Sequence, residues 1–349
     1  MAFESLSKRS VDGPTLAALI SAAFGPETGI AAAKEINEGF FNAAFRVTLT
    51  DGREVVLKAS PEPRIPLLTY ERDIMRGEAE FFRAAADGGV LVPEVLCANF
   101  EREVIDGDFI VMSAVDGVTW YSVEQRLDEG AKAELKRQLG GIAAQLHRVT
   151  HPRGRFGYPA VDELSGSTWP EAFAAMIGAV LDDADRFNAP LPLPSSQVRK
   201  AAARHADALA AIKAPALVHF DLWPGNVMIT GHEAADGDAT GNANAAASRI
   251  SGLIDGERMI WGDPLMEFVG MAVFGRADQD EHVRAGYLAA GGAIDDGEAA
   301  ERRMTLYHLY MQVLLLTEMG PRGYTDPEYL KHFGQECPKR IFEAVNKLS

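Results

Sequence analysis

Three side chains between positions 219 and 255 have the types and spacing that phosphoryl transfer requires. The segment His-Phe-Asp-Leu-Trp-Pro-Gly-Asn places Asp221 five residues before Asn226, and a second carboxylate follows at Asp255. Phosphoryl transfer needs a carboxylate that orients a hydroxyl group and oxygen ligands that hold Mg²⁺. Asp221 can supply the first of these, and Asn226 together with Asp255 can supply the second.

Short β-rich segments on both sides are expected to hold these side chains in place. Residues 216–219 form an apolar run that enters a polar loop, and residues 226–230 leave that loop as a second run. The run 249–255 ends at Asp255, so pairing of the last two strands would place this carboxylate beside the loop. Residues 231–248 are rich in Ala, Gly, Asn and Asp without periodicity, which predicts a long hairpin loop.

A further candidate, Lys58, lies far upstream in a predicted β-hairpin. Residues 45–58 alternate apolar and polar side chains on both sides of an Asp-Gly pair, which is a strong hairpin signal. Lys58 ends the returning strand. Residues 70–86 follow as a predicted helix, because their apolar side chains recur at helical spacing. The hairpin therefore carries a cation at a strand end, ahead of a helix that contains several glutamates.

Beyond residue 117 the chain is predicted to be mostly helical. The predicted helices cover residues 134–148, 169–187, 198–212, 265–274 and 304–319. Asp263 before Pro264 is expected to cap the fourth of them, because proline is favoured at the first helical position. His219 is expected to brace its loop rather than to act as a base.

The order and spacing of these motifs resemble the aminoglycoside phosphotransferase and choline kinase-like family of small-molecule kinases, relatives of the protein kinases. The family usually reads His-Gly-Asp-x-x-x-x-Asn, and Phe220 takes the place of the glycine here. A Gly-Asp-Pro triplet at residues 262–264 also matches the family. The resemblance implies an α+β, bilobal protein kinase-like fold. Its small β-rich N-lobe would cover residues 1–114, and its larger, mainly helical C-lobe would cover residues 115–349.

The same resemblance implies a role for each candidate residue. Asp221 would be the catalytic base, and Asn226 and Asp255 would hold Mg²⁺ against the phosphates of ATP. Lys58 would contact the α and β phosphates. A glutamate from the predicted helix would orient this lysine. Glu78 matches the family best for that role, and the alternatives are Glu80 and Glu71.

Two other segments occupy the places of nucleotide-binding elements in the family. Residues 37–42 precede the hairpin, where the family has the loop that covers the nucleotide, and residues 108–117 take the place of the hinge that binds adenine. An ordinary β-turn and an edge strand are the alternative interpretations. The residues implied in nucleotide contacts are Gly39, Phe40, Asn42, Ser113 and Val115.

The resemblance implies ATP-dependent phosphorylation of a hydroxyl group on a small molecule, such as an aminoglycoside, an amino sugar or an aminoalcohol. Trp223 resembles a variation seen among fructosamine and amino-sugar kinases. A catalytically silent nucleotide-binding module is one alternative, but the intact Asp221 and Asp255 argue against it. A kinase acting on proteins is the other, but Asp263 follows Asp255 by only eight residues, which leaves little room for an activation segment. The acceptor, the choice between ATP and GTP, and the oligomeric state stay open.

Composition and charge narrow the class of protein further. The chain has 349 residues, 47% of them hydrophobic, which suffices for two lobes of sizeable core. A formal net charge of −16 argues against binding of nucleic acid, whose phosphates it would repel. Cys97 and Cys337 offer no disulfide framework or zinc spacing. The sequence shows no signal peptide and no apolar segment long enough to span a membrane, so a soluble, cytoplasmic protein is expected.

Overall fold

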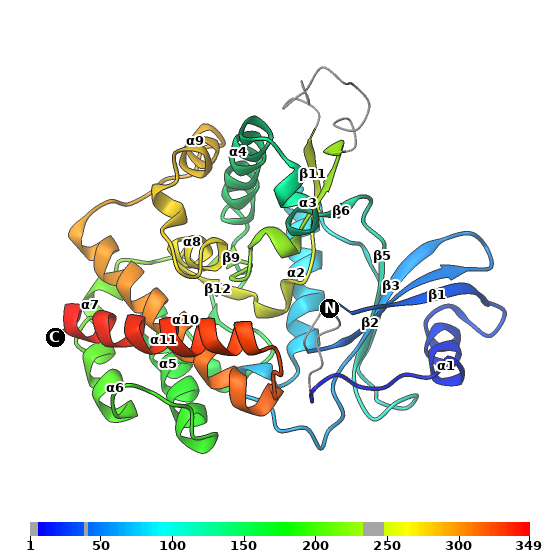
Figure 1. Cartoon of the computed structure of the whole chain (residues 1–349), viewed down its shortest axis with the longest axis horizontal. Coiled ribbons are helices and arrows are strands. Elements are labelled where there is room, and N and C mark those ends of the chain that lie inside the picture. The colour runs from blue at the N-terminus through cyan, green and yellow to red at the C-terminus, as the bar shows by residue number, and fades with distance from the viewer. Residues whose placement is uncertain (1–5, 38–40, 233–247) are drawn as a thin grey trace.

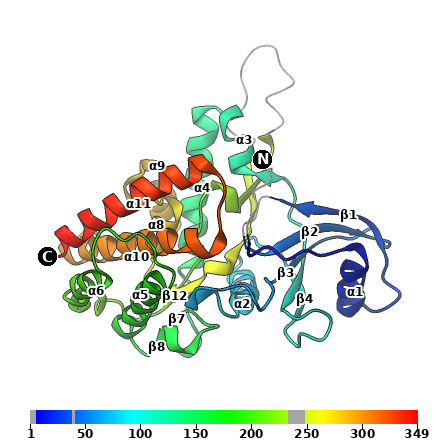
Figure 2. The same ribbon diagram turned by 60° about the horizontal axis from the view of Figure 1, so that its bottom comes forward.

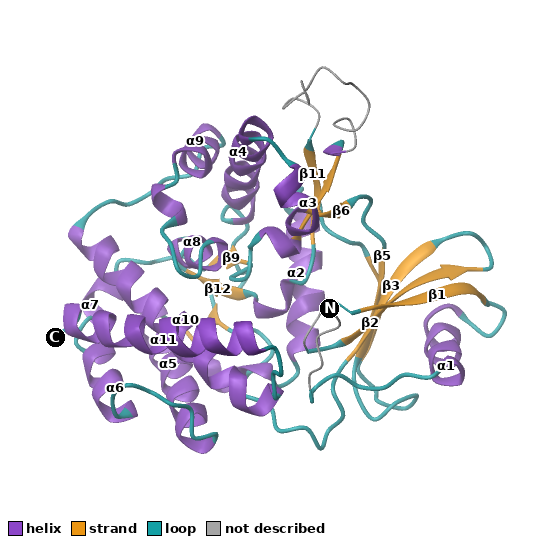
Figure 3. Ribbon diagram, in the orientation of Figure 1, coloured by secondary structure: helices purple, strands orange, loops and turns teal. Residues whose placement is uncertain are grey.

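A computed structural model describes residues 6–37, 41–232 and 248–349 of the chain. In this structure a five-stranded antiparallel sheet lies beside a larger group of helices (Figure 1). The sheet comes from the N-terminal part of the chain, and most helices come from the C-terminal part (Figure 3). The predicted α+β fold with a β-rich N-lobe and a mainly helical C-lobe is therefore confirmed.

The N-lobe sheet has the strand order β1-β2-β3-β5-β4. Its strands are β1 (Ile30–Ile36), β2 (Ala43–Leu49), β3 (Glu54–Ala59), β4 (Val95–Asn99) and β5 (Phe109–Ser113). The predicted hairpin is the β2–β3 pair, in which Ala44 lies opposite Lys58. Strand β1 and the preceding helix α1 (Gly13–Phe24) were not predicted.

The two faces of this sheet pack against different helices because side chains alternate along each strand. Val55 and Leu57 of β3 pack in one core with Leu19 and Ile20 of α1. Lys58 points to the opposite face, where helix α2 (Ile74–Asp87) lies. The alternation in β3 therefore buries its apolar residues against α1 and directs its lysine toward α2.

The C-lobe contains nine of the described helices, and its long helices form the main core. These are α3 (Trp120–Val123), α4 (Glu129–Leu146), α5 (Trp169–Arg186), α6 (Ser195–Ala203), α7 (Ala206–Leu209), α8 (Leu265–Met271), α9 (Glu281–Ala289), α10 (Glu298–Arg322) and α11 (Pro327–Lys347). Helix α10 lies between α11 and α5 (Figure 2). Among the helices that the structure describes, none combines the length and the apolar character that crossing a membrane requires.

Two small sheets of the C-lobe hold the loops that carry the candidate residues. One has the order β11-β10-β6, from Arg249–Leu253, Val227–Thr230 and Val118–Thr119. The other has the order β8-β7-β12-β9, from Ser165–Gly166, Phe156–Gly157, Ile260–Gly262 and Ala216–Val218. Strands β10 and β11 pair antiparallel as predicted. Most of the predicted 231–248 loop between them lies outside the described residues.

The segment that precedes α2 is buried among C-lobe helices. Leu68 and Tyr70 of this segment, with Ile74 at the start of α2, belong to the same hydrophobic core as the large side chains of α5 and α10. The Thr69 backbone N–H also donates to Asp183 of α5, at 2.6 Å from its Oδ2. The entry to α2 is thus anchored in the C-lobe, and the body of the helix packs both on strands β4 and β5 and on the C-lobe turn Gly256–Arg258.

Candidate functional site

Strands β9 and β10 position the loop that carries Asp221 and Asn226. A 3₁₀ turn, Pro224–Asn226, closes the loop and leads directly into β10. Asn226 Nδ2 donates to the Asp221 backbone oxygen at 2.8 Å and lies 3.2 Å from Asp221 Oδ2. The structure therefore brings the two side chains into direct contact. Asn226 Oδ1 accepts no hydrogen bond from any described residue.

The backbone before Asp221 is held in an unusual conformation from several sides. Phe220 has a φ of 63°, in the left-handed region that favours glycine, and its buried ring stacks on Tyr310 at 5.8 Å between centroids. Glu267 accepts from the backbone N–H groups of His219 and Phe220, at 2.9 and 3.1 Å. His219 Nε2 lies 2.9 Å from the carbonyl oxygen of Ile254. These contacts fix the loop even though Phe220 replaces the usual glycine.

Replacing Phe220 by glycine should lower stability. Glycine removes the cost of left-handed backbone, about 1–2 kcal/mol, but loss of a buried phenylalanine side chain costs about 3–5 kcal/mol. We therefore expect Phe220→Gly to reduce the free energy of unfolding by about 2 kcal/mol, measured from the urea dependence of unfolding. Phe220→Leu keeps the backbone cost with less loss of volume and serves as the comparison. Equal or greater stability of Phe220→Gly would contradict this account.

Asp255 lies beside the same loop because β10 and β11 pair. The Ile254 N–H donates to the Asn226 carbonyl oxygen at 3.0 Å, so the two strand ends stay together. Asp255 itself has a left-handed φ of 61° and turns the chain toward α2. Gly256 allows this approach, since a Cβ atom there would lie 2.2 Å from the ring of Phe81.

Lys58 contacts both Glu78 and Asp255, with Nζ 2.5 Å from an oxygen of each carboxylate. Among the three glutamates that the sequence offered, Glu78 is thus the one in contact with the lysine. Burial acts to lower the pKa of Lys58, but attraction to the two carboxylates outweighs it and raises the pKa above its ordinary value. The lysine therefore stays charged at the junction of the two lobes.

The other two glutamates point elsewhere. Glu71 pairs with Arg322 of α10 at 2.6 Å. Glu80 lies two residues after Glu78, which on a helix is nearly the opposite face, and it accepts from Trp261 Nε1 at 2.7 Å. Their separate partners explain why only Glu78 reaches Lys58.

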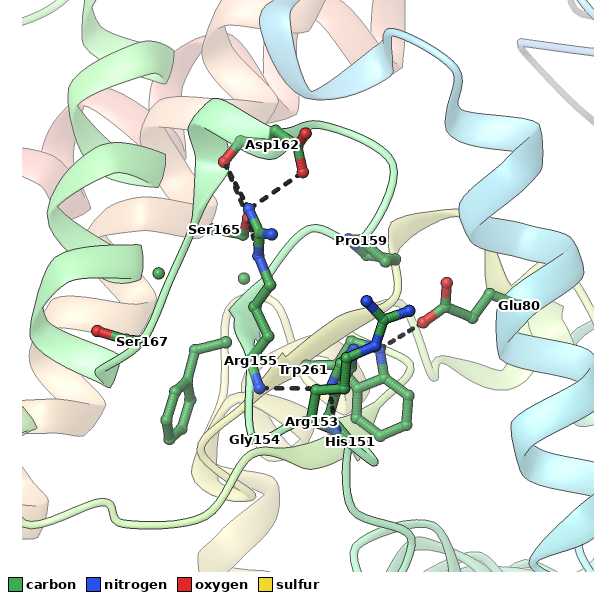
Figure 4. Close-up of a pocket in the computed structure, with 13 residues that line it drawn as sticks. Glu80, His151, Arg153, Gly154, Arg155, Pro159, Asp162, Ser165, Ser167 and Trp261 are labelled. Atoms are coloured by element: carbon green, nitrogen blue, oxygen red, sulfur yellow. Dashed lines mark hydrogen bonds and ion pairs between the residues drawn. The ribbon is translucent and has the colours of Figure 1, made fainter.

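A cavity of about 670 Å³ lies on the Glu80 side of α2 (Figure 4). Its polar lining is largely engaged, since Arg155 pairs with Asp162 at 3.0 Å and Glu80 binds Trp261. Of the predicted site residues that the structure describes, none lines this cavity. The cavity is therefore separate from the place where Asp221 and Lys58 lie.

Two residues that the sequence analysis missed, Glu257 and Arg258, join the site directly after Asp255. Asn42 Nδ2 donates to Glu257 Oε2 at 2.8 Å, so the predicted nucleotide loop reaches this carboxylate. Burial and repulsion from Asp255 raise the pKa of Glu257 well above its usual value. The sequence signal that could have identified them is the acidic and basic pair that follows soon after the strand-terminal Asp255. Gly39 and Phe40, predicted in the same nucleotide loop as Asn42, lie outside the described residues.

The predicted hinge residues lie where β5 leaves the sheet. Ser113 ends β5, and its backbone N–H donates to the Glu94 carbonyl oxygen at 2.9 Å. Val115 lies in the connection to β6, and its side chain is close to Gly252. Its backbone makes no hydrogen bond to the part of the chain that the structure describes. The amide of Ser113 is already used, so the backbone of Val115 is the better placed for a nucleotide contact.

The carboxylates around the loop differ in their electrostatic surroundings. Burial raises the pKa of the Asp221 carboxyl, although the nearby Arg258 guanidinium acts in the opposite direction. Burial also acts to raise the pKa of Asp255, but its contact with Lys58 outweighs burial and lowers it. Asp255 is therefore the more strongly ionised of the two.

The oxygen atoms of Asn226 and Asp255 fit a magnesium ion whose remaining ligands would be phosphate oxygens and water. Mg²⁺ is commonly held by one or two carboxylates together with phosphate oxygens and water. Asp255 offers a carboxylate, and Asn226 turns its amide nitrogen to Asp221, which leaves Oδ1 available as a ligand. The described residues contain no group of three or more His, Cys, Asp or Glu side chains that could hold a metal.

Comparison with known proteins assigns the family. A model of the phosphotransferase enzyme family matches residues 32–307, which is most of the chain. The chain belongs to this family. No individually curated protein matches this phosphotransferase in sequence.

Solved structures of similar fold include three kinds of small-molecule kinase. A candidate fructosamine-3-kinase from Thermobifida fusca has a TM-score of 0.62 and 21% identity, covering 97% of this chain and 99% of its own. APH(2″)-IIa, solved with streptomycin and ATP, has a TM-score of 0.57 and 16% identity, with 97% and 99% covered. The macrolide 2′-phosphotransferase MphH from Brachybacterium faecium has a TM-score of 0.52 and 18% identity, with 95% and 96% covered. At these identities the likeness shows the fold of the phosphotransferase.

Proposed function

We propose that this phosphotransferase moves the γ-phosphoryl group of ATP to a hydroxyl group of a small molecule in a Mg²⁺-dependent reaction. One observation carries the proposal: three segments bring four side chains together, because Lys58 contacts Asp255, Asn226 contacts Asp221, and the hydrogen bond from the Ile254 N–H to the Asn226 carbonyl oxygen holds the two pairs side by side. Phosphoryl transfer depends mainly on positioning and on stabilisation of charge, which is what such a set provides. No covalent enzyme intermediate is needed.

Each side chain has a distinct role in the proposed reaction. Asp221 orients the acceptor hydroxyl and takes its proton, while Asn226 steadies the carboxylate through Oδ2. Asp255 and the Oδ1 atom of Asn226 would hold Mg²⁺, which when bound neutralises the charge that develops on the phosphates. Lys58 would direct its charge at the α and β phosphates, with Glu78 as the partner that fixes its direction.

Charge and aromatic groups favour an acceptor that carries hydroxyl groups and an amine. The net charge of −16 attracts cations and neutral polyols more readily than anions. Trp223 lies two residues after Asp221, and its ring pairs with the exposed Tyr121 at 5.2 Å between centroids. Aromatic faces attract ammonium groups. The proposed acceptor class is therefore an aminoglycoside, an amino sugar or an aminoalcohol.

A coupled nucleotide-consumption assay over these three acceptor classes tests the proposal, with ATP and GTP as donors. We expect at least one acceptor to raise nucleotide consumption well above hydrolysis by water, and mass spectrometry to find one phosphate added to it. The metal requirement is tested by chelation with EDTA and restoration with Mg²⁺. Consumption that no acceptor stimulates would overturn the proposal.

The two neighbouring glutamates of α2 give a matched pair of variants. Glu78→Gln weakens a buried, charge-assisted hydrogen bond to Lys58, worth about 1.5–3 kcal/mol, so we expect kcat/KM for ATP to fall about 10- to 100-fold. Glu80→Gln keeps an oxygen for Trp261 on the other face of the helix and should stay within about twofold of wild type. The measurement is initial rate against ATP concentration. Equal losses in both variants would contradict the orienting role of Glu78.

A further inference from the structure

Arg258 is a buried cation between two carboxylates, one of which belongs to Asp221. It ends the 3₁₀ turn Gly256–Arg258 that follows Asp255, and its side chain is 8% exposed. Its Nη2 donates to Glu318 of α10 at 2.9 Å, and its Nε lies 4.0 Å from Asp221 Oδ2. Its Nη1 is buried and has no hydrogen-bond partner among the described residues. The guanidinium is thus anchored on one side and has an unused donor.

The Asp221 carboxylate has room for a second donor on the oxygen that faces Arg258. Oδ2 accepts one hydrogen bond, from Asn226, and a carboxylate oxygen can accept two. Hydrogen bonds between catalytic groups are often long in the free enzyme and shorten in the substrate complex. A movement of about 1 Å would bring Arg258 from its present distance to charge-assisted hydrogen-bond range.

Contacts behind Arg258 hold it in place. Glu318 also accepts from the Tyr70 hydroxyl at 2.5 Å, and it lies 3.3 Å from Nη1 of Arg322. Arg322 in turn pairs with Glu71 at 2.6 Å. All of these side chains are buried. The anchor of Arg258 therefore joins α10 to the segment that leads into α2, the helix that carries Glu78.

We propose that Arg258 is a positioning residue for Asp221. Its guanidinium closes onto Oδ2 of the Asp221 carboxylate, so that the other carboxylate oxygen stays directed at the acceptor hydroxyl. The inference rests on the proposed function for the role of Asp221. Two donors on one oxygen prevent rotation of the carboxylate, whereas Asn226 alone does not. Loss of this constraint lowers the rate of the chemical step more than it lowers affinity for either substrate.

Kinetics of Arg258→Met, Arg258→Lys and Arg303→Met separate positioning from folding. Arg303 is the matched control, because it is equally buried on α10 and pairs with Asp263 at 2.8 Å. We expect Arg258→Met to lower kcat about 10- to 100-fold with KM for both substrates within about threefold. Arg258→Lys should recover part of the loss, and folded Arg303→Met should keep its kcat within about threefold. A wild-type kcat in Arg258→Met, or an equal loss in Arg303→Met, overturns the proposal.

The side-chain amide of Asn226 reports the position of Asp221 without any turnover, because its Nδ2 donates to the Asp221 carboxylate. In ¹⁵N-labelled protein its resonances are assigned by their disappearance in Asn226→Asp. We expect Arg258→Met to shift them and Arg303→Met to leave them in place, with Arg258→Lys used if the methionine variant does not fold. Unshifted resonances in the Arg258 variants refute the positioning role. If the resonances shift but the wild-type protein phosphorylates no acceptor, the proposed function is refuted and the contact between Arg258 and Asp221 is not.

Discussion

Asp221→Asn should lower the rate of phosphoryl transfer about 10³-fold, within the 10²- to 10⁴-fold range typical of general acid–base catalysis. The asparagine keeps the shape of the side chain and can still accept the hydrogen bond from Asn226 Nδ2. It cannot take the proton of the acceptor hydroxyl. The dissociation constant for nucleotide should therefore stay within about twofold of wild type, measured by calorimetry alongside kcat from the coupled assay.

A buried aspartate away from the site provides the control for this substitution. Asp278 is buried in the C-lobe and pairs with Arg276 at 2.7 Å. Asp278→Asn removes a buried charge without touching the Asp221 loop, so folded protein should keep its kcat. Transfer at near wild-type rate in Asp221→Asn would remove this residue from the proposed role.

Asp255→Asn should lower kcat/KM for ATP by about 10³-fold, since a bound metal ion contributes several kcal/mol to stabilisation of the transition state. The substitution removes the carboxylate ligand proposed for Mg²⁺ and one of the two partners of Lys58. The buried carboxylate of Glu78 would still pair with Lys58 and keep that lysine in place. The fall in kcat/KM should therefore come from weaker binding of Mg²⁺ rather than from displacement of the lysine.

The dependence of rate on Mg²⁺ concentration checks this expectation. We expect half-maximal activity of Asp255→Asn at a Mg²⁺ concentration well above that of wild type, with only part of the rate restored at saturation. Glu78→Gln should keep the wild-type dependence on Mg²⁺, because Lys58 is the one hydrogen-bonding partner of the Glu78 carboxylate among the described residues. An unchanged Mg²⁺ dependence in Asp255→Asn would show that this carboxylate does not hold the metal.

The sequence was most informative where a motif is continuous and its flanking strands are apolar. The spacing of Asp221 and Asn226, together with a strand that ends at Asp255, indicated a shared loop, and the structure pairs β10 with β11 there. The choice among the three glutamates was harder. The apolar pattern predicts one helix over residues 70–86, but Asp73 has a left-handed φ of 52° and breaks it. The break separates Glu71 from α2, whereas Glu78 lies on the buried face of α2, and resemblance to the family had favoured Glu78 over the other two.

The full length of α10 and the pairing of Arg258 were missed because the polar residues involved are buried by partners distant in sequence. Helix α10 was predicted to span residues 304–319 but extends over Glu298–Arg322, with Arg303 and Arg322 buried against acidic partners. Helix α11 contains Pro338 in its interior, which weakens the local helical signal. Arg258 meets Glu318 across 60 residues of chain, so no short window of sequence reveals the pair. Composition and local patterns do not carry such information.

Leu68 and Tyr70 precede the lobe boundary in sequence, but they are buried among C-lobe helices. The boundary along the chain and the boundary between the packed cores therefore differ. The boundary between residues 114 and 115 stays a prediction, and a cut there would separate Glu71 from Arg322 and Tyr70 from Glu318. A chimera that joined this N-lobe to the C-lobe of another phosphotransferase would bring half of a buried ionic network without its complement. Exchange of the nucleotide-binding and acceptor-binding halves among such enzymes is therefore constrained by four side chains, and contact with a substrate is required of none of them. They are Tyr70, Glu71, Glu318 and Arg322.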